Sequence, residues 1–148
     1  MAQSAIDITK YLVLKAQNTE GSDFLSNLKV QKLLYYCQGF FYAKNQEKLF
    51  NEDIVAWQYG PVVTEVYHEL KEFGQSGISL DVSSDFNIDF SDKEREMVDE
   101  VFNYFNQFSA NKLMNMTHEE SPWIDTPLKS VITLDKLKKH FEEFLVDE

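Results

Sequence analysis

Apolar residues recur at helical spacing along most of the chain, and most densely between residues 27 and 44. There, one helical face carries Val30, Leu33, Leu34, Cys37 and Phe41. A polar and aromatic row runs along its flank: Gln31, Tyr35, Gln38 and Tyr42. Because a helix that is apolar or aromatic around most of its girth is usually central to a fold, we expect this helix to form the centre of the domain.

Five further segments show helical periodicity, each next to a residue that favours a helix start. The first helix is predicted from a cap at Ser4 or Asp7 to about residue 18, where the chain reaches a Gly-containing break. Ser91 and Glu94 have capping-box spacing and predict a helix from residue 92. The remaining predicted starts are Pro61 in the first turn of one helix, a Ser109 cap and a Thr133 cap.

A short β element interrupts the helical pattern. Residues 54–58 are β-branched and aromatic and end at Gly60-Pro61, which predicts a strand followed by a tight turn. We expect residues 78–82 to pair with this strand as a two-stranded ribbon packed on helices. The predicted fold is therefore mainly α: a compact single-domain helical bundle over residues 1–148, with a small two-stranded β element.

Charge and cysteine content narrow the classes of function. Asp and Glu number 25 against 14 Lys and Arg, and this net charge of −11 argues against direct binding of nucleic acid phosphates. It suits a soluble protein or one with a basic partner. The first residues lack the basic and apolar regions of a signal peptide, and no apolar run approaches the ~20 residues of a membrane span, so we expect a cytoplasmic protein. A single cysteine, Cys37, on the apolar helical face predicts an inert structural thiol.

Candidate chemistry concentrates in the segment NMTHEESPWID, residues 115–125. His118 has no second histidine at the spacing of a helical zinc pair, and Ser121 lacks the glycine-flanked turn of a serine nucleophile. The glycines are too scattered for a phosphate-binding loop. We therefore expect no catalytic residue, no metal site, no cofactor and no enzyme activity.

The same segment has two competing structural interpretations. Thr117 and Glu120 have capping-box spacing, whereas Ser121 could instead cap a turn with Pro122 at the first helical position. In either arrangement we expect Trp123 to anchor this corner of the fold on the core, because so large an aromatic side chain buries considerable area.

Four blocks of the chain together resemble a known family. They are NLKVQKLLYYCQGF at residues 27–40, AWQYGPVVTEVYHELK at 56–71, FSDKEREMVDEVFNYF at 90–105 and MTHEESPW at 116–123. In this order they are similar to the Panacea, or SocA-like, antitoxin domain, which phage- and mobile-element-associated proteins of the GepA type share. The resemblance covers residues 6–145 and implies the neutralising half of a toxin–antitoxin pair, a family not known for catalysis.

The resemblance and the residue types divide the motif positions into two groups. We expect a structural role for one group: Trp57, Gly60, Pro61, Thr117, Pro122 and Trp123. The other group is polar or amphipathic and is a candidate partner-binding groove: Gln31, Tyr35, Tyr59, Tyr67 and His118. An alternative for the second group is that the polar tips satisfy buried backbone groups. Ile124-Asp125 stands where a basic residue is common in the family, which bears on the identity of the partner.

These observations predict an antitoxin-like protein that binds a cognate toxin and neutralises it by direct contact, in a prophage or other mobile element. The expected partner is a toxin protein from a neighbouring gene, with a protease as a second candidate, and with no direct contact to nucleic acid or membrane. The alternative is a protein-binding adaptor, either for a protease or as a phage regulatory module. A hydrolase centred on His118 is the third hypothesis.

Overall fold

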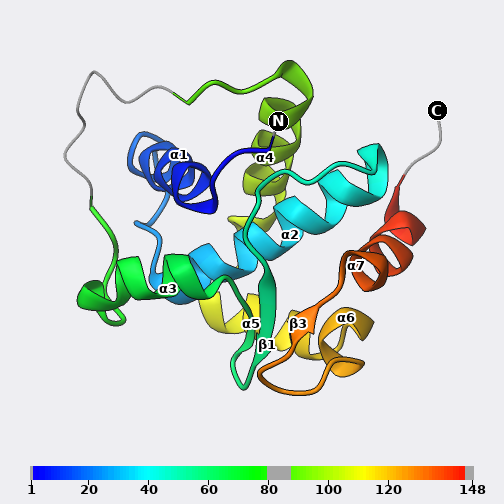
Figure 1. Cartoon of the computed structure of the whole chain (residues 1–148). Coiled ribbons are helices and arrows are strands. Elements are labelled where there is room, and N and C mark those ends of the chain that lie inside the picture. The colour runs from blue at the N-terminus through cyan, green and yellow to red at the C-terminus, as the bar shows by residue number, and fades with distance from the viewer. Residues whose placement is uncertain (1, 80–87, 146–148) are drawn as a thin grey trace.

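The predicted central helix forms the axis of the fold. A computed structural model describes residues 2–79 and 88–145, and α2 (Asn27–Asn45) runs through its middle (Figure 1). Every residue from 31 to 39 is buried, so α2 is covered on all sides over two turns. The sequence predicts a helix start near Asn27 with Asn27 as its cap, but the cap is Ser26, whose hydroxyl accepts the N–H of Lys29.

Four helices pack most extensively against α2: α1 (Ala5–Gln17), α4 (Asp92–Phe105), α5 (Ala110–His118) and α7 (Leu134–Phe141). Their predicted caps are confirmed, since Ser4, Ser91, Ser109 and Thr133 each accept a backbone N–H three residues later. The α7 helix packs tightly on α2 at Gly39, where the Phe141 ring occupies the space that a side chain would need. The prediction of a compact, mainly helical fold is therefore confirmed.

The β element differs from the predicted ribbon. Strand β1 (Ile54–Trp57) lies between β2 (Gly60–Val62) and β3 (Val131–Ile132) in a three-stranded antiparallel sheet. The prediction that residues 78–82 pair with residues 54–58 is wrong, because both edges of β1 are occupied by β2 and β3. Ile78 instead donates its N–H to the carbonyl of Leu25, and residues 80–82 lie outside the described part of the chain.

The predicted place of Pro61 in the first turn of a helix is also wrong. Gly60 has a φ of 104°, which lets the chain reverse at once, so Pro61 enters β2 opposite Ala56. Proline is tolerated in an edge strand such as β2, because the N–H that proline lacks would face the side of the strand that has no neighbouring strand. Helix α3 (Thr64–Leu70) therefore begins three residues later and continues as the 3-10 turn η1 (Lys71–Phe73).

Two short helical segments complete the described chain: α6 (Ser121–Ile124) and the 3-10 turn η2 (Glu142–Phe144). Figure 1 shows the β1–β2 turn, β3 and α6 together at one end of the molecule, away from α1 and α4. Among the described residues, no helix combines the length and apolar character needed to cross a membrane.

Candidate functional site

The turn between β1 and β2 is held on one side by the segment that the sequence singles out. The indole Nε1 of Trp123 donates to the carbonyl oxygen of Trp57 at 2.8 Å. The imidazole Nε2 of His118 lies 2.9 Å from the carbonyl oxygen of Gln58 and donates to it. Both carbonyls lie at the turn end of the hairpin, where side chains from α5 and α6 bind them.

The opposite side of the hairpin is held by α2. Lys32 Nζ donates to the carbonyl oxygen of Pro61 at 3.0 Å, and Gln31 Oε1 accepts the N–H of Val63 at 2.8 Å. We call Gln31, Lys32, His118 and Trp123 the hairpin latch. Together its four side chains bind four backbone groups between residues 57 and 63, which fixes the turn from both sides.

Gly60 is required where the two halves of the hairpin latch meet. A Cβ atom at this position would lie 2.8 Å from Thr117 Oγ1 and 2.9 Å from Lys32 Cε, both too close for carbon. The Thr117 hydroxyl cannot rotate away freely, because it donates to the carbonyl oxygen of Met114 at 2.7 Å. Glycine is therefore needed at this position for two reasons: it adopts the positive φ of the turn, and it leaves room for the side chains of α5 and α2.

Lys32 is a buried amine with a backbone acceptor. Its side chain is completely buried, and the ion pairs of the described residues do not include it. Burial lowers the pKa of Lys32 to about 7, since an ammonium group loses its hydration there without gaining a carboxylate. The Lys32 amine therefore holds the hairpin through a directional hydrogen bond to the carbonyl oxygen of Pro61.

A second polar cluster ties the 115–125 segment to the core. Tyr35 and Tyr36 each donate a hydroxyl hydrogen bond of 2.9 Å to Glu120, one to each carboxylate oxygen. Burial raises the pKa of Glu120, and the two tyrosine hydrogen bonds oppose that shift. His140 Nε2 lies 3.9 Å from Glu120 Oε1, and burial lowers the pKa of His140.

This cluster also decides between the two capping interpretations. The predicted Thr117–Glu120 capping box is wrong, because the Glu120 carboxylate turns to the tyrosines and the Thr117 hydroxyl stays within α5. The alternative is closer to the structure. Helix α6 begins at Ser121 itself, preceded by Glu120 without a side-chain cap, and Pro122 is its second residue.

The candidate partner-binding residues have different environments. Tyr59 is 61% exposed at the tip of the hairpin, whereas Gln31 and Tyr35 are buried and bind the protein's own groups. Tyr67 and His118 are half-buried. The structure brings four rings together around the hairpin: Trp57 lies 4.9 Å from Tyr67, and His118 lies 4.3 Å from Trp123. A role in partner binding stays a prediction for all five residues.

Sequence reasoning missed the roles of Lys32 and Glu120. Lys32 belongs to the motif shared with the family, and a lysine within a helix apolar on all sides signals a buried amine. The adjacent Tyr35-Tyr36 pair indicated an acceptor, but the sequence could not show that the acceptor comes from residue 120.

The recess next to the sheet is small for a substrate, and it lies outside the hairpin latch. A recess between Gln38, Asp53 and Leu137 encloses about 50 Å³, compared with roughly 300–1,000 Å³ for a typical ligand pocket. No group of three His, Cys, Asp or Glu side chains in the described residues is arranged to hold a metal ion. The His118 Nε2 that a hydrolase would use is bound to the Gln58 carbonyl oxygen.

Comparison with known proteins points to one family. The family model for the antitoxin SocA-like, Panacea domain matches residues 30–124, a range that includes the complete hairpin latch. The chain is 31% identical over 109 residues to antitoxin SocA of Caulobacter vibrioides (strain NA1000 / CB15N). That match covers 67% of this chain and 58% of the relative, so it spans less than two thirds of the relative's length. No solved structure matches the chain.

Proposed function

Since this chain belongs to the antitoxin SocA-like, Panacea domain family, we propose that it is an antitoxin that binds a cognate toxin protein and blocks it by direct contact. The antitoxin role follows from the family, and the relative at 31% identity is itself named an antitoxin. Direct contact, without a chemical step of its own, is the finer part of the proposal.

The observation that carries the proposal is the hairpin latch. Its side chains fix the backbone of the β1–β2 turn and leave Tyr59 61% exposed at the tip. A rigid turn with a projecting tyrosine suits protein recognition, because little conformational entropy is lost on binding and tyrosine often dominates interface energies.

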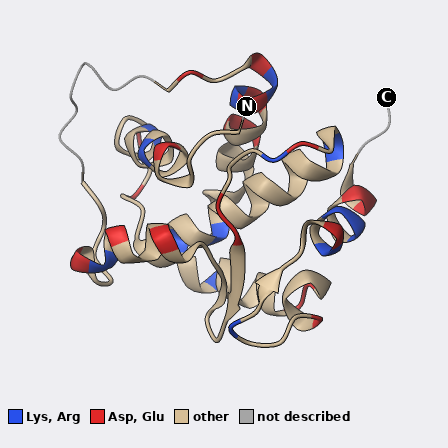
Figure 2. Cartoon of the chain, viewed as in Figure 1, with Lys and Arg blue, Asp and Glu red and all other residues tan. Residues whose placement is uncertain are grey.

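Charge supports the same partner class. The net charge of −11 accelerates encounter with a basic protein and repels nucleic acid. Figure 2 shows acidic residues on α3, on α4 and on η2, the turn that follows α7. The attraction extends about 10 Å at 0.1 M salt and weakens as salt is added.

The test is co-expression with the neighbouring gene whose product alone stops growth. We expect this chain to restore growth and to co-purify with that product. Tyr59→Ala and His118→Ala should weaken rescue while the free protein keeps its circular dichroism spectrum. Tyr104→Ala is the matched control, since Tyr104 is 57% exposed on α4, away from the hairpin.

The outcomes separate the three functional hypotheses. Growth restored with no complex, while the toxin disappears only when a protease is present, would identify an adaptor. A chemically altered toxin after substoichiometric treatment would identify an enzyme. Full rescue by both Tyr59→Ala and His118→Ala would retain the antitoxin role and remove the hairpin from the interface.

A further inference from the structure

Large apolar side chains gather around the tip of the hairpin. The described residues expose seven large hydrophobic side chains, of which four belong to this end of the molecule. These are Tyr59 at 61%, Ile124 and Leu128 at 56% each, and Val131 at 45%. We call these four residues the apolar face; the others, Phe24, Tyr104 and Phe144, belong to separate elements.

Backbone and side-chain hydrogen bonds tie the segments that carry the apolar face to one hairpin. Lys129, next to Leu128, donates its N–H to the carbonyl oxygen of Ala56 at 2.6 Å. Trp123, next to Ile124, donates to the carbonyl oxygen of Trp57 at 2.8 Å. Tyr59 is two residues beyond Trp57 on the same hairpin. The segment from α6 to β3 is therefore tied along the hairpin.

The apolar face continues onto the outer side of the sheet. Val131 pairs with Val55 across β3 and β1, so the two side chains share one face. Ile54, Ala56 and Ile132 on the opposite face are buried, whereas Val55 is only half-buried. The inner face of the sheet packs on the core, whereas the outer face is exposed to solvent at Val131.

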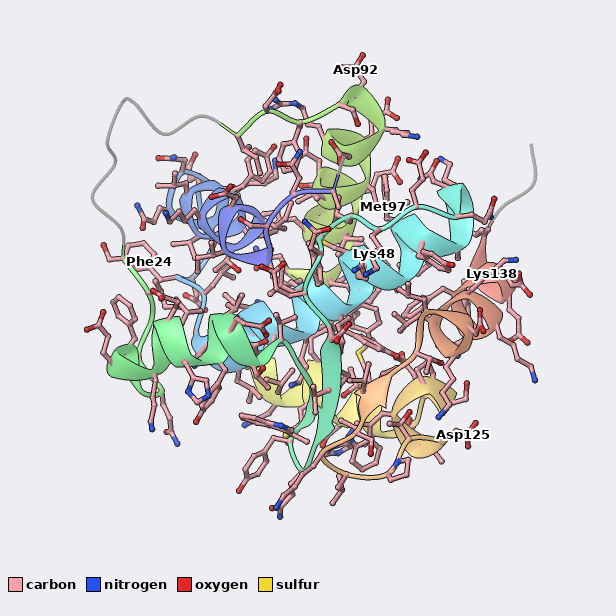
Figure 3. The ribbon with its side chains drawn as sticks, viewed as in Figure 1. Phe24, Lys48, Asp92, Met97, Asp125 and Lys138 are labelled. Carbon is pink, nitrogen blue, oxygen red and sulfur yellow. The ribbon has the colours of Figure 1, made fainter. Side chains whose placement is uncertain are left out.

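The charged groups around the apolar face are mainly acidic. Residues 53–60 and 118–135 carry four exposed carboxylates, Asp53, Glu119, Asp125 and Asp135, against one exposed ammonium group, that of Lys129. The ammonium of Lys136, which donates to the Asp125 carbonyl oxygen at 2.7 Å, adds a second positive charge, but carboxylates still outnumber ammonium groups. Asp125 itself points away from the body of the molecule (Figure 3).

We infer that the apolar face is the docking surface for a toxin whose complementary surface has an apolar centre and a basic rim, an inference that rests on the proposed antitoxin function. Leu128 and Val131 form the half of the surface that lies outside residues 30–124, the range matched by the family model. The toxin's apolar groups cover these side chains, and its lysines or arginines meet the surrounding carboxylates.

A second copy of this chain is the weaker candidate for the same surface. Two copies would each bring a net charge of −11 and the same acidic rim into contact. Like charges facing each other across an interface are unfavourable, so the rim selects against self-association through this face.

The experiment measures binding of the purified full chain to the growth-arresting product of the neighbouring gene, made as an inactive variant. Leu128→Arg and Val131→Arg should each weaken the Kd at least about 30-fold, the effect of a central interface residue. Tyr104→Arg is the matched control, with 57% exposure against 56% for Leu128, and should change the Kd less than about 2-fold. Each variant's Tm should stay within a few degrees of wild type.

A second arm tests the basic rim. Reversing Glu119 and Asp125 to lysine should slow association about 10-fold at low salt and much less at 0.5 M salt. The same reversal at Glu96 and Glu100, both exposed on α4, is the control for the equal loss of net negative charge and should slow association less.

Three results would overturn the inference. Unchanged affinity of the Leu128 and Val131 variants, with wild-type binding intact, would move the interface elsewhere and leave the proposed function standing. A wild-type dimer that Leu128→Arg dissociates would make the apolar face a self-association surface. Absence of any wild-type complex, despite growth rescue, would remove both this inference and neutralisation by contact.

Discussion

Replacing Lys32 by methionine should alter how stability depends on pH. Lys32 is completely buried and donates to the Pro61 carbonyl oxygen, and burial lowers its pKa from 10.5 to about 7. Methionine has a similar length and no charge, so it keeps most of the packing while removing the titrating group. The loss of the hydrogen bond to Pro61 costs about 1 kcal/mol, and this cost is nearly independent of pH.

The size of the pH effect follows from the pKa of Lys32 in the unfolded chain, 10.5, and in the folded chain, about 7. Between pH 7 and pH 10.5 the unfolded chain holds a proton on Lys32 that the folded chain has released. Stability therefore rises with pH in this window, by at most about 1.4 kcal/mol per pH unit. From pH 7.5 to pH 9.5, the free energy of unfolding of the wild type should rise by about 2.5 kcal/mol relative to Lys32→Met.

Urea unfolding of both proteins at pH 7.5, 8.5 and 9.5 is the assay. Taking the difference between the two proteins cancels other groups that titrate nearby, including Cys37 and Tyr11, whose pKa values burial raises. A wild-type-minus-variant difference that stays constant across this range would show that Lys32 keeps its charge in the folded protein. The lowered pKa of the buried Lys32 amine would then be wrong.

Three further predictions concern the same core. Trp123→Ala should lower the free energy of unfolding in urea by about 3 kcal/mol, near the lower end of the cost of tryptophan truncation, because the side chain is half-buried. Unchanged stability together with lost toxin binding would make Trp123 an interface residue instead. Gly60→Ala should cost about 2–4 kcal/mol by the same assay, because it combines a positive φ with contacts below 3 Å to Thr117 and Lys32; a loss below 1 kcal/mol would mean that the turn relaxes freely. Cys37 should react with a thiol reagent only after unfolding, since it is completely buried and burial raises its pKa; rapid labelling of the native protein would contradict its position in the core.

Local signals made the helices predictable. A helix start that consists of a capping hydroxyl and an apolar stripe can be recognised from neighbouring residues alone. The four helices outside α2 that have this pattern begin where the sequence predicts. The sheet was less predictable because its pairing depends on distant segments. Strand β3 has two residues, too few for a periodic pattern, and it joins β1 from 76 residues further along the chain at the Val55–Val131 pair.

The candidate site shows the same limit. Trp57, Gly60, His118 and Trp123 were identified by their motif, and they do meet around one hairpin. The hydrogen bonds of His118 and Trp123 go to backbone carbonyl oxygens of the hairpin. The type of a residue does not show which backbone carbonyl its side chain will bind. The apolar face was not predicted, because Leu128 and Val131 lie in a stretch with little periodicity and only the three-dimensional structure shows that neighbouring elements leave them exposed.

Hydrogen exchange of the backbone amides, compared between the free chain and its complex with the toxin, tests the account most directly. Binding at the apolar face predicts slower exchange in peptides covering residues 57–60 and 124–132, with little change in α1 and α4. Slower exchange confined to α4 or α7, with the hairpin and β3 exchanging as in the free chain, would contradict it.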